Sequence, residues 1–234
     1  MFNSIKKIIQ NFNAKRELTK YAPELNYEAE NLKIEDLIDL IYSKKWARFF
    51  WILQNKLEIT SLVKAVAGLK PKIIVEIGTN MGGSLFYFTK VADSEALIIS
   101  IDLPGGLGGG GYPDYRTDFY YSFKSSKQKM LLWRLDSHLN ATLETLKNTL
   151  GDQKIDFLFL DADHSYEGIK QDFEMFSPLV RKDGVIAFHD IKHTEPDNWI
   201  QVDKFWNEIK KEYKHEEFID TSTKWGGIGI VYQK

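Results

Sequence analysis

Carboxylates recur along this sequence at or just after short apolar runs, and their type and position suit ligand binding. The five runs are KIIVEI (72–77), ALIIS (96–100), MLLWRL (130–135), IDFLFL (155–160) and GVIAFH (184–189). The acidic residues in or near them are Glu76, Asp102, Asp136, Asp161, Asp163 and Asp190. Carboxylates at all five positions are hard to explain by solvation alone. They can accept hydrogen bonds from ammonium and hydroxyl groups or coordinate a divalent cation.

The segment EIGTNMGGS (76–84) predicts a turn between a strand and a helix. It lacks the G-x-G-x-x-G spacing of dinucleotide sites and the G-K-[ST] of a phosphate loop. Glu76 would repel phosphate but suits an ammonium group, and Ser84 at the helix start can bind a carboxylate with nearby N–H groups. A ligand with both groups, plus a ribose for Asp102, is S-adenosylmethionine. The competing interpretation is that the glycines only let the helix pack on the strand.

The five apolar runs also predict the secondary structure that positions these carboxylates. Short, nearly continuous apolar runs are typical of strands buried on both faces of a sheet. Helical patterns separate them at 84–92, about 115–127, 139–150 and 166–177. We therefore predict a doubly wound α/β fold with a mostly parallel sheet and helices on both faces. The tail adds a helix, FWNEIKKEY, and an antiparallel closing pair, HEEFID and GGIGIVYQ. Ligands of such sheets bind beyond the carboxyl ends of the strands, where the acids lie.

Residues 1–70 carry the apolar spacing of helices, and this pattern stops at Gly68 and Pro71. We predict a helical N-terminal extension or cap over 1–60. The aromatic cluster is interpreted as core, and it comprises Trp46, Phe49, Phe50 and Trp51. The first eighteen residues are interpreted as an amphipathic helix that packs on this protein or on a partner. Peripheral membrane contact is the less favoured alternative.

Composition limits the other classes of function. The 234 residues suffice for one domain with an appendage, and the formal net charge is −2. Without a basic excess, we expect no nucleic-acid partner. Without cysteine, any metal ion would bind carboxylates and imidazoles. No apolar run reaches the length of an integral membrane segment and the start lacks a signal-peptide pattern, so we expect a cytoplasmic protein.

Five segments, taken in order, resemble class I S-adenosylmethionine-dependent methyltransferases. They are VEIGTNMGGS, SIDLPGGLGGGGYP, LDSHLN, FLFLDADHSYEGIKQDF and PLVRKDGVIAFHDI, and QNKLEI (54–59) resembles the helix that enters that domain. More narrowly, the chain resembles the group with macrocin-type sugar O-methyltransferases and cephalosporin-hydroxylase-like proteins. The resemblance implies a seven-stranded sheet ending in an antiparallel strand, with the methyltransferase domain over 61–234.

The resemblance also implies which residues bind the cofactor. For its methionine end they are Glu76, Gly78, Asn80, Gly82 and Ser84. Asp102 would bind the ribose, and Asp136 with Ser137 would border the adenine. Asp161 is also expected beside the cofactor.

We expect the metal-binding and catalytic residues at the carboxyl ends of the fourth and fifth runs. Adjacent parallel strands lie about 4.8 Å apart, so Asp161 and Asp190 could share one Mg²⁺ or Mn²⁺ ion. In catechol-type O-methyltransferases, which the chain resembles here, acids occupy these two positions and also that of His189. The predicted metal set is therefore Asp161, His189 and Asp190, while it stays open whether His189 is a ligand or weakens the site. The alternative is that both acids only cap helices and bind backbone groups.

His164 is the predicted general base, because an acceptor hydroxyl attacks a methyl group poorly until its proton is removed. It follows Asp161 by three residues, and Asp161 is counted with it in the catalytic set. By resemblance, His164 matches the lysine base of catechol-type enzymes and a histidine of macrolide sugar methyltransferases. His138 and His193 are alternative bases, and His215 is expected on the surface.

The glycine-rich loop holds six glycines within residues 105–111, directly after Asp102. We predict a mobile flap over cofactor and acceptor, with 112–116 lining the acceptor side, and a passive connection is the alternative. The leading function is a metal-assisted O-methyltransferase acting on a hydroxyl of a sugar, glycoconjugate or small natural product. The alternative is a non-catalytic module that keeps the fold and binds S-adenosylmethionine or a partner. Homo-oligomer formation is left open.

Overall fold

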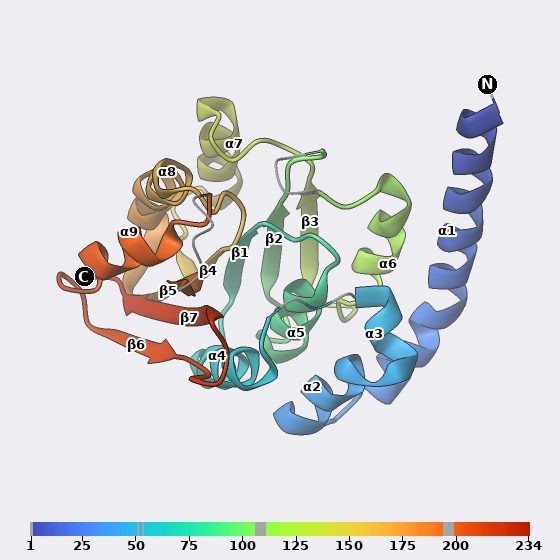
Figure 1. Ribbon diagram of the computed structural model, residues 1–234, viewed down its shortest axis with the longest axis horizontal. Helices are drawn as coiled ribbons and strands as arrows, with labels where there is room; N and C mark the ends of the chain where they lie inside the picture. Colours follow the sequence, from blue (N-terminus) through green and yellow to red (C-terminus); the bar gives the residue numbers. More distant parts are fainter. Residues whose placement is uncertain (1, 51, 53, 106–110, 194–198) are drawn as a thin grey trace.

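A seven-stranded sheet organises the chain, with strand order β3-β2-β1-β4-β5-β7-β6 (Figure 1). The strands are β1 (Ile73–Ile77), β2 (Leu97–Ile101), β3 (Lys129–Trp133), β4 (Ile155–Leu160), β5 (Val180–His193), β6 (His215–Phe218) and β7 (Trp225–Tyr232). The first five pair in parallel, while β7 runs antiparallel to both β5 and β6. This confirms the α/β fold with an antiparallel closing strand. The computed structural model describes residues 2–50, 52, 54–105, 111–193 and 199–234.

Helices cover both faces of the sheet (Figure 1). One layer contains α4 (Lys56–Leu69), α5 (Gly83–Val91) and α6 (Thr117–Tyr121), and the other contains α7 (Asn140–Leu150), α8 (Tyr166–Phe176) and α9 (Val202–Ile209). Short 3₁₀ turns, η2 (Asp114–Arg116) and η3 (Ser177–Leu179), precede α6 and β5. Successive side chains of a strand point to opposite faces. Thus Ile74 packs with the α4–α6 layer, whereas Val75 packs with α7–α9.

The N-terminal helices α1 (Phe2–Glu28), α2 (Ile34–Tyr42) and α3 (Lys44–Phe50) join the first of these layers. Trp46, Phe49 and Phe50 are buried there, which confirms the core interpretation for these three, while Trp51 lies outside the described residues. The division between 1–60 and 61–234 stays a prediction. Within the described ranges, no helix combines the length and apolarity needed to span a bilayer.

Several predicted elements differ in extent from the structure, and the tail helix expected at FWNEIKKEY (205–213) is α9 (Val202–Ile209). The helix expected over 115–127 is α6 (Thr117–Tyr121), and after it the Ser122 hydroxyl donates to Phe119 O (2.6 Å) and Phe123 is buried in the core. Strand β5 is longer than the predicted 184–189. Its extension at the carboxyl end arises because Lys192 and His193 still pair with β7.

Candidate active site

The turn after β1 lies directly against the tip of β4. Gly78 has a φ of +92°, and a Cβ atom at this position would lie 2.1 Å from the carbonyl oxygen of Asp161. Only glycine fits such an approach. The Gly78 N–H donates to Ile101 O (2.9 Å) and the Asp161 N–H donates to Ile77 O (2.8 Å). The predicted cofactor turn and the predicted catalytic tip are therefore in contact.

Glu76 is fully buried on β1, just before this turn. Its Oε2 accepts a hydrogen bond from the Thr79 hydroxyl (3.0 Å), and its Oε1 has no hydrogen-bond partner among the described residues. Burial raises the pKa of Glu76 to about 8, although the hydroxyls of Ser84 and Thr79 act in the opposite direction. A buried carboxyl group with an unused oxygen is costly to retain, and an incoming ammonium group would satisfy it.

Asp102 follows β2 and holds the same turn from the other side. Its Oδ2 accepts hydrogen bonds from the backbone N–H groups of Thr79 (3.0 Å) and Asn80 (2.7 Å). Burial raises the pKa of Asp102, partly offset by these hydrogen bonds and by Arg134. Asn80 itself has a left-handed φ of +44°. The predicted ribose-binding residue thus also fixes the backbone of the predicted methionine-end turn.

Arg116, which the sequence places among the residues lining the acceptor side, instead clamps this turn. Arg116 is buried, and its Nε donates to the Tyr120 hydroxyl (2.8 Å) while its Nη2 donates to Met81 O (3.1 Å). The Tyr120 hydroxyl donates in turn to Asn80 O (2.7 Å). A Cβ atom at Gly82, whose φ is +81°, would lie 2.6 Å from the Tyr120 ring. Arg116 therefore supports the turn from within the core instead of lining an acceptor site.

The predicted adenine edge forms a short turn after β3. Ser137 is buried, and Asp136 Oδ1 accepts a hydrogen bond from the His138 N–H (2.9 Å). The His138 ring lies beside the buried Asp172 of α8, with Nε2 and Oδ1 3.4 Å apart. The nearby Asp172 carboxylate raises the pKa of His138. This pairing turns His138 toward α8 and makes it a weaker candidate for the base.

Four side chains meet at the tips of β4 and β5. They are Asp161, His164, His189 and Asp190. His164 Nδ1 lies 2.6 Å from Asp190 Oδ2, and its Nε2 lies 3.7 Å from Asp161 Oδ1. His189 Nδ1 lies 3.2 Å from Asp161 Oδ1 and 3.4 Å from Asp190 Oδ1. The structure thus brings together the predicted catalytic and metal-binding residues.

Electrostatics couple these four groups. Burial alone would lower the pKa of His164 and of His189, but the carboxylates of Asp161 and Asp190 outweigh it, and both pKa values rise, that of His189 strongly. Burial would likewise raise the pKa of Asp190, yet the two imidazoles hold it far below its usual range. Two carboxylates and two imidazoles therefore balance one another in a buried cluster.

The backbone at Asp190 is unusual for a strand residue. Its φ is +61°, in the left-handed region, and the register between β5 and β7 shifts between His189 and Lys192. Bulges of this kind redirect a side chain, and strained non-glycine backbone concentrates at functional sites. Here the bulge accompanies the carboxylate that binds His164.

Two neighbours of this cluster have no site role predicted from the sequence. Gln54, between α3 and α4, donates from Nε2 to Asp161 Oδ2 (2.9 Å), and its backbone oxygen accepts from the Tyr42 hydroxyl (2.6 Å). The ring of Trp199 lies 5.6 Å from that of His164 between centroids, and Trp199 is 52% exposed. An exposed aromatic ring next to the candidate base offers a surface for a ligand.

The side chains of this cluster are of the types that coordinate a divalent cation, but their present arrangement does not form a coordination site. Both ring nitrogens of His189 are buried and without a hydrogen bond among the described residues, and two carboxylates adjoin them. Yet no group of three or more acidic or histidine side chains in the described ranges is arranged to hold a metal ion. The reason is that each carboxylate already faces an imidazole.

The remaining predictions for this rim concern His193, His215 and the glycine-rich loop. Both ring nitrogens of His193 are buried and lack hydrogen bonds to other described residues, whereas His215 is exposed on β6 as expected. The central part of the predicted flap, residues 106–110, lies outside the described residues.

The strand order and the glycine turn after β1 define the fold of class I methyltransferases. The O-methyltransferase of Bacillus cereus, solved with S-adenosylhomocysteine (SAH), is 15% identical with a TM-score of 0.57, covering 92% of this chain and 99% of that chain. The O-methyltransferase TomG of Streptomyces achromogenes, solved with S-adenosylmethionine, is 15% identical with a TM-score of 0.56, covering 89% and 94%. At these identities the likeness shows the fold alone.

Sequence comparison identifies the family. Residues 75–191, half of the chain, match the family described as a methyltransferase domain, and the chain belongs to this family. An uncharacterised protein of Sinorhizobium fredii is 28% identical over 147 residues, which are 62% of this chain and 16% of that protein. An uncharacterised protein of Acanthamoeba polyphaga mimivirus is 33% identical over 116 residues, half of each chain. The chain thus spans at most half the length of these relatives.

Proposed function

We propose that this protein is an S-adenosylmethionine-dependent O-methyltransferase. The observation that carries this proposal is the contact of Gly78 with the Asp161 backbone, which joins the glycine turn to the His164–Asp190 pair. A cofactor bound at that turn would have its reactive end beside a candidate base. The methyltransferase-domain family and the bound SAH and S-adenosylmethionine of the two structural neighbours support the same conclusion.

The proposed cofactor contacts use groups that the fold leaves available. Oε1 of Glu76, which lacks a partner among the described residues, would accept a hydrogen bond from the ammonium group. Asp102 would bind the ribose hydroxyls, and Ser137 would border the adenine. S-adenosylmethionine, when bound, supplies an electrophilic methyl group.

The proposed base is the Nε2 atom of His164. Asp190 accepts the Nδ1–H of His164, which orients the ring, selects the tautomer with a free Nε2 and stabilises the imidazolium. The acceptor hydroxyl would give its proton to Nε2 as its oxygen forms the new bond to the methyl carbon and the carbon–sulfur bond of the sulfonium breaks, which leaves SAH. The proton would later pass to water. Gln54 holds Oδ2 of the neighbouring Asp161 and so limits the rotation of that carboxylate.

The position of Trp199 favours an acceptor that contains a ring. Its side chain is half exposed and its ring lies beside His164, so a sugar or aromatic ring stacked on it would approach the base. This favours a hydroxyl of a sugar, glycoconjugate or small ring-containing natural product.

We also propose that Mg²⁺ or Mn²⁺ assists the reaction, held by Asp161, His189 and Asp190. When bound, such an ion would lower the pKa of the acceptor hydroxyl. The donor types support this, although the imidazole–carboxylate pairs would have to separate.

Transfer of a labelled methyl group from S-adenosylmethionine tests the proposed function. Nucleotide sugars, oligosaccharides and catechols would be offered with Mg²⁺ or Mn²⁺, and His164→Ala would be the matched control. We expect one acceptor class to become labelled by the wild type and not by the variant. Binding of SAH without transfer to any acceptor would instead favour a non-catalytic binding module, and absence of SAH binding would contradict the proposal altogether.

A further inference from the structure

Helix α1 presents two different sides along its length. In its C-terminal half, Leu18, Ala22 and Leu25 are buried against the rest of the protein. At about 100° per residue, Phe12 and Ile9 lie roughly 120° and 180° around the helix from Leu18. They are accordingly 66% and 54% exposed. Ile9 and Phe12 therefore face away from the protein body, and Figure 1 shows the N-terminal half of α1 projecting beyond the other helices.

The sequence continues this apolar pattern toward the N-terminus. In the sequence, the same three- and four-residue spacing runs back from Phe12 and Ile9 to Ile5 and Phe2. The exposed apolar side chains of Ile9 and Phe12 call for another apolar environment.

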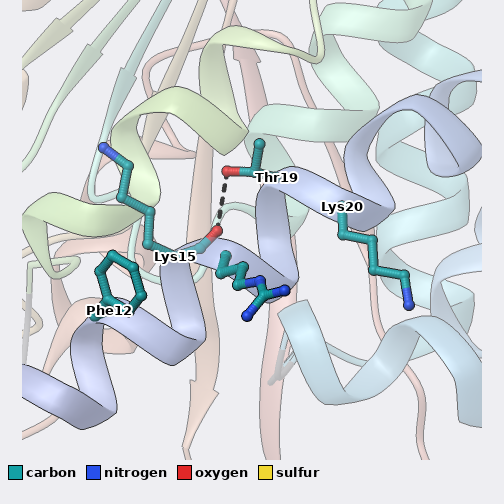
Figure 2. Close-up of a pocket in the computed structure, with 5 residues that line it drawn as sticks. Phe12, Lys15, Thr19 and Lys20 are labelled. Atoms are coloured by element: carbon teal, nitrogen blue, oxygen red, sulfur yellow. Dashed lines mark hydrogen bonds between the residues drawn. The ribbon is translucent and has the colours of Figure 1, made fainter.

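Basic side chains accompany this stripe. A shallow hollow of about 430 Å³ is lined by Phe12, Lys15, Arg16, Thr19 and Lys20, and Figure 2 shows Lys15 and Lys20 extending from the same helix as Phe12. Lys15 reaches Asp118 (2.8 Å), but Arg16 and Lys20 form no ion pair with another described residue. Residues 1–16 contain four Lys or Arg and no Asp or Glu, while the whole chain carries a net charge of −2.

We propose that the exposed side of α1 between Ile9 and Lys20 binds the surface of an anionic lipid bilayer. Ile9 and Phe12 would enter the boundary between headgroups and acyl chains, with Arg16 and Lys20 against the phosphates. Helices that combine an apolar side with a basic one bind membranes in this way. A second copy of this chain fits less well, because pairing the same sides would bring their cations together.

Binding of the full chain to vesicles tests this proposal. Vesicles of phosphatidylcholine with roughly one quarter phosphatidylglycerol would be compared with pure phosphatidylcholine by co-sedimentation. We expect at least about tenfold stronger partitioning into the anionic vesicles at about 0.1 M NaCl, and a large loss at about 0.5 M NaCl, because salt screens the headgroup charge.

Two double substitutions separate the contributions of the apolar and the basic side chains to membrane binding. Ile9→Ser with Phe12→Ser should weaken binding at least about tenfold, since both apolar side chains are lost. Arg16→Gln with Lys20→Gln should weaken it by a similar factor, since each cation near an anionic surface contributes about fivefold. Leu57→Ser is the matched apolar control, because Leu57 is also 54% exposed but lies on α4, and Lys127→Gln is the control for charge. Both controls should bind as the wild type, and all variants should melt as the wild type does.

Three results would overturn the proposal. The first is wild-type protein that does not bind anionic vesicles. The second is an Ile9→Ser/Phe12→Ser variant that binds them as well as the wild type, which would indicate adsorption by charge alone. The third is a dimer in sedimentation velocity that this variant abolishes without any vesicle binding, which would assign the apolar side to a second copy.

Discussion

The side-chain amide of Gln54 donates a hydrogen bond to Oδ2 of Asp161, 107 residues further along the chain, at 2.9 Å. The other carboxylate oxygen, Oδ1, lies 3.2 Å from His189 Nδ1 and 3.7 Å from His164 Nε2. The two oxygens of Asp161 thus face different groups, and the N-terminal segment contributes directly to the candidate active site.

Gln54→Leu should lower the turnover of the enzyme about tenfold, because a hydrogen bond to a charged acceptor contributes roughly 1.5–3 kcal/mol. SAH affinity should change little, since the side-chain hydrogen bond of Gln54 goes to Asp161 and not to Glu76 or Asp102, which are proposed to bind the ammonium group and the ribose. The control is Asn55→Ala, which removes the cap of α4 and should reduce stability by about 1 kcal/mol while turnover is kept. Steady-state kinetics on the labelled acceptor and thermal melting would measure both. Turnover of Gln54→Leu within twofold of the wild type would remove this role.

His164→Ala should reduce turnover by about 10²–10⁴, the usual contribution of a positioned base. Added imidazole should restore part of the rate, because a free base can occupy the space of the lost ring. His138→Ala should keep most of the activity, since His138 faces Asp172 on α8. If His164→Ala retains a rate within a few-fold of the wild type, the base is another group.

SAH affinity should rise with pH because of Glu76. The pKa of this group is about 8 in the ligand-free protein against 4.5 normally, so the buried carboxyl is protonated at neutral pH. Its ammonium partner needs the ionised form, so binding releases a proton and should strengthen about tenfold per unit below pH 8, then level off. Calorimetry at several pH values, in buffers of different ionisation enthalpy, measures both effects. A wild-type affinity independent of pH would show that Glu76 does not meet the ammonium group.

The raised pKa of Glu76 also predicts how the stability of the protein changes with pH. The folded protein retains the Glu76 proton over pH 4.5 to about 8, whereas the unfolded chain has lost it, so this group lowers the free energy of unfolding as pH rises through that window. Glu76→Gln should remove this component of the slope in a melting series. An unchanged slope would indicate that Glu76 is ionised in the folded protein.

Removal of divalent metal should abolish most of the turnover, and Mn²⁺ or Mg²⁺ should restore it. Asp190→Asn should weaken Mn²⁺ binding, followed by the electron paramagnetic resonance of the free ion, while SAH binding remains. Full turnover after verified removal of metal would leave the His164–Asp190 pair to act without an ion.

The sheet could be predicted because buried parallel strands leave a local pattern, the short apolar run, and the carboxyl ends of such strands meet at one edge. That rule is enough to bring Asp161 and Asp190 together. The roles of Gln54, Arg116 and Trp199 could not be predicted this way, because each depends on a contact with a residue distant in sequence. The bulge at Asp190 was likewise invisible, since its cause is the partner strand β7.

The position of β7 has a consequence for the synthesis of the protein. His189 on β5 pairs with Ile228 on β7, a strand formed by residues that leave the ribosome after all those proposed for chemistry. While the chain is being made, the segment that carries His189 and Asp190 has its parallel neighbour β4 but lacks its antiparallel one. In the nascent protein, Asp190 should therefore orient the base His164 only after residues 225–232 have emerged. Deleting that strand should abolish activity, although it contains none of the catalytic residues.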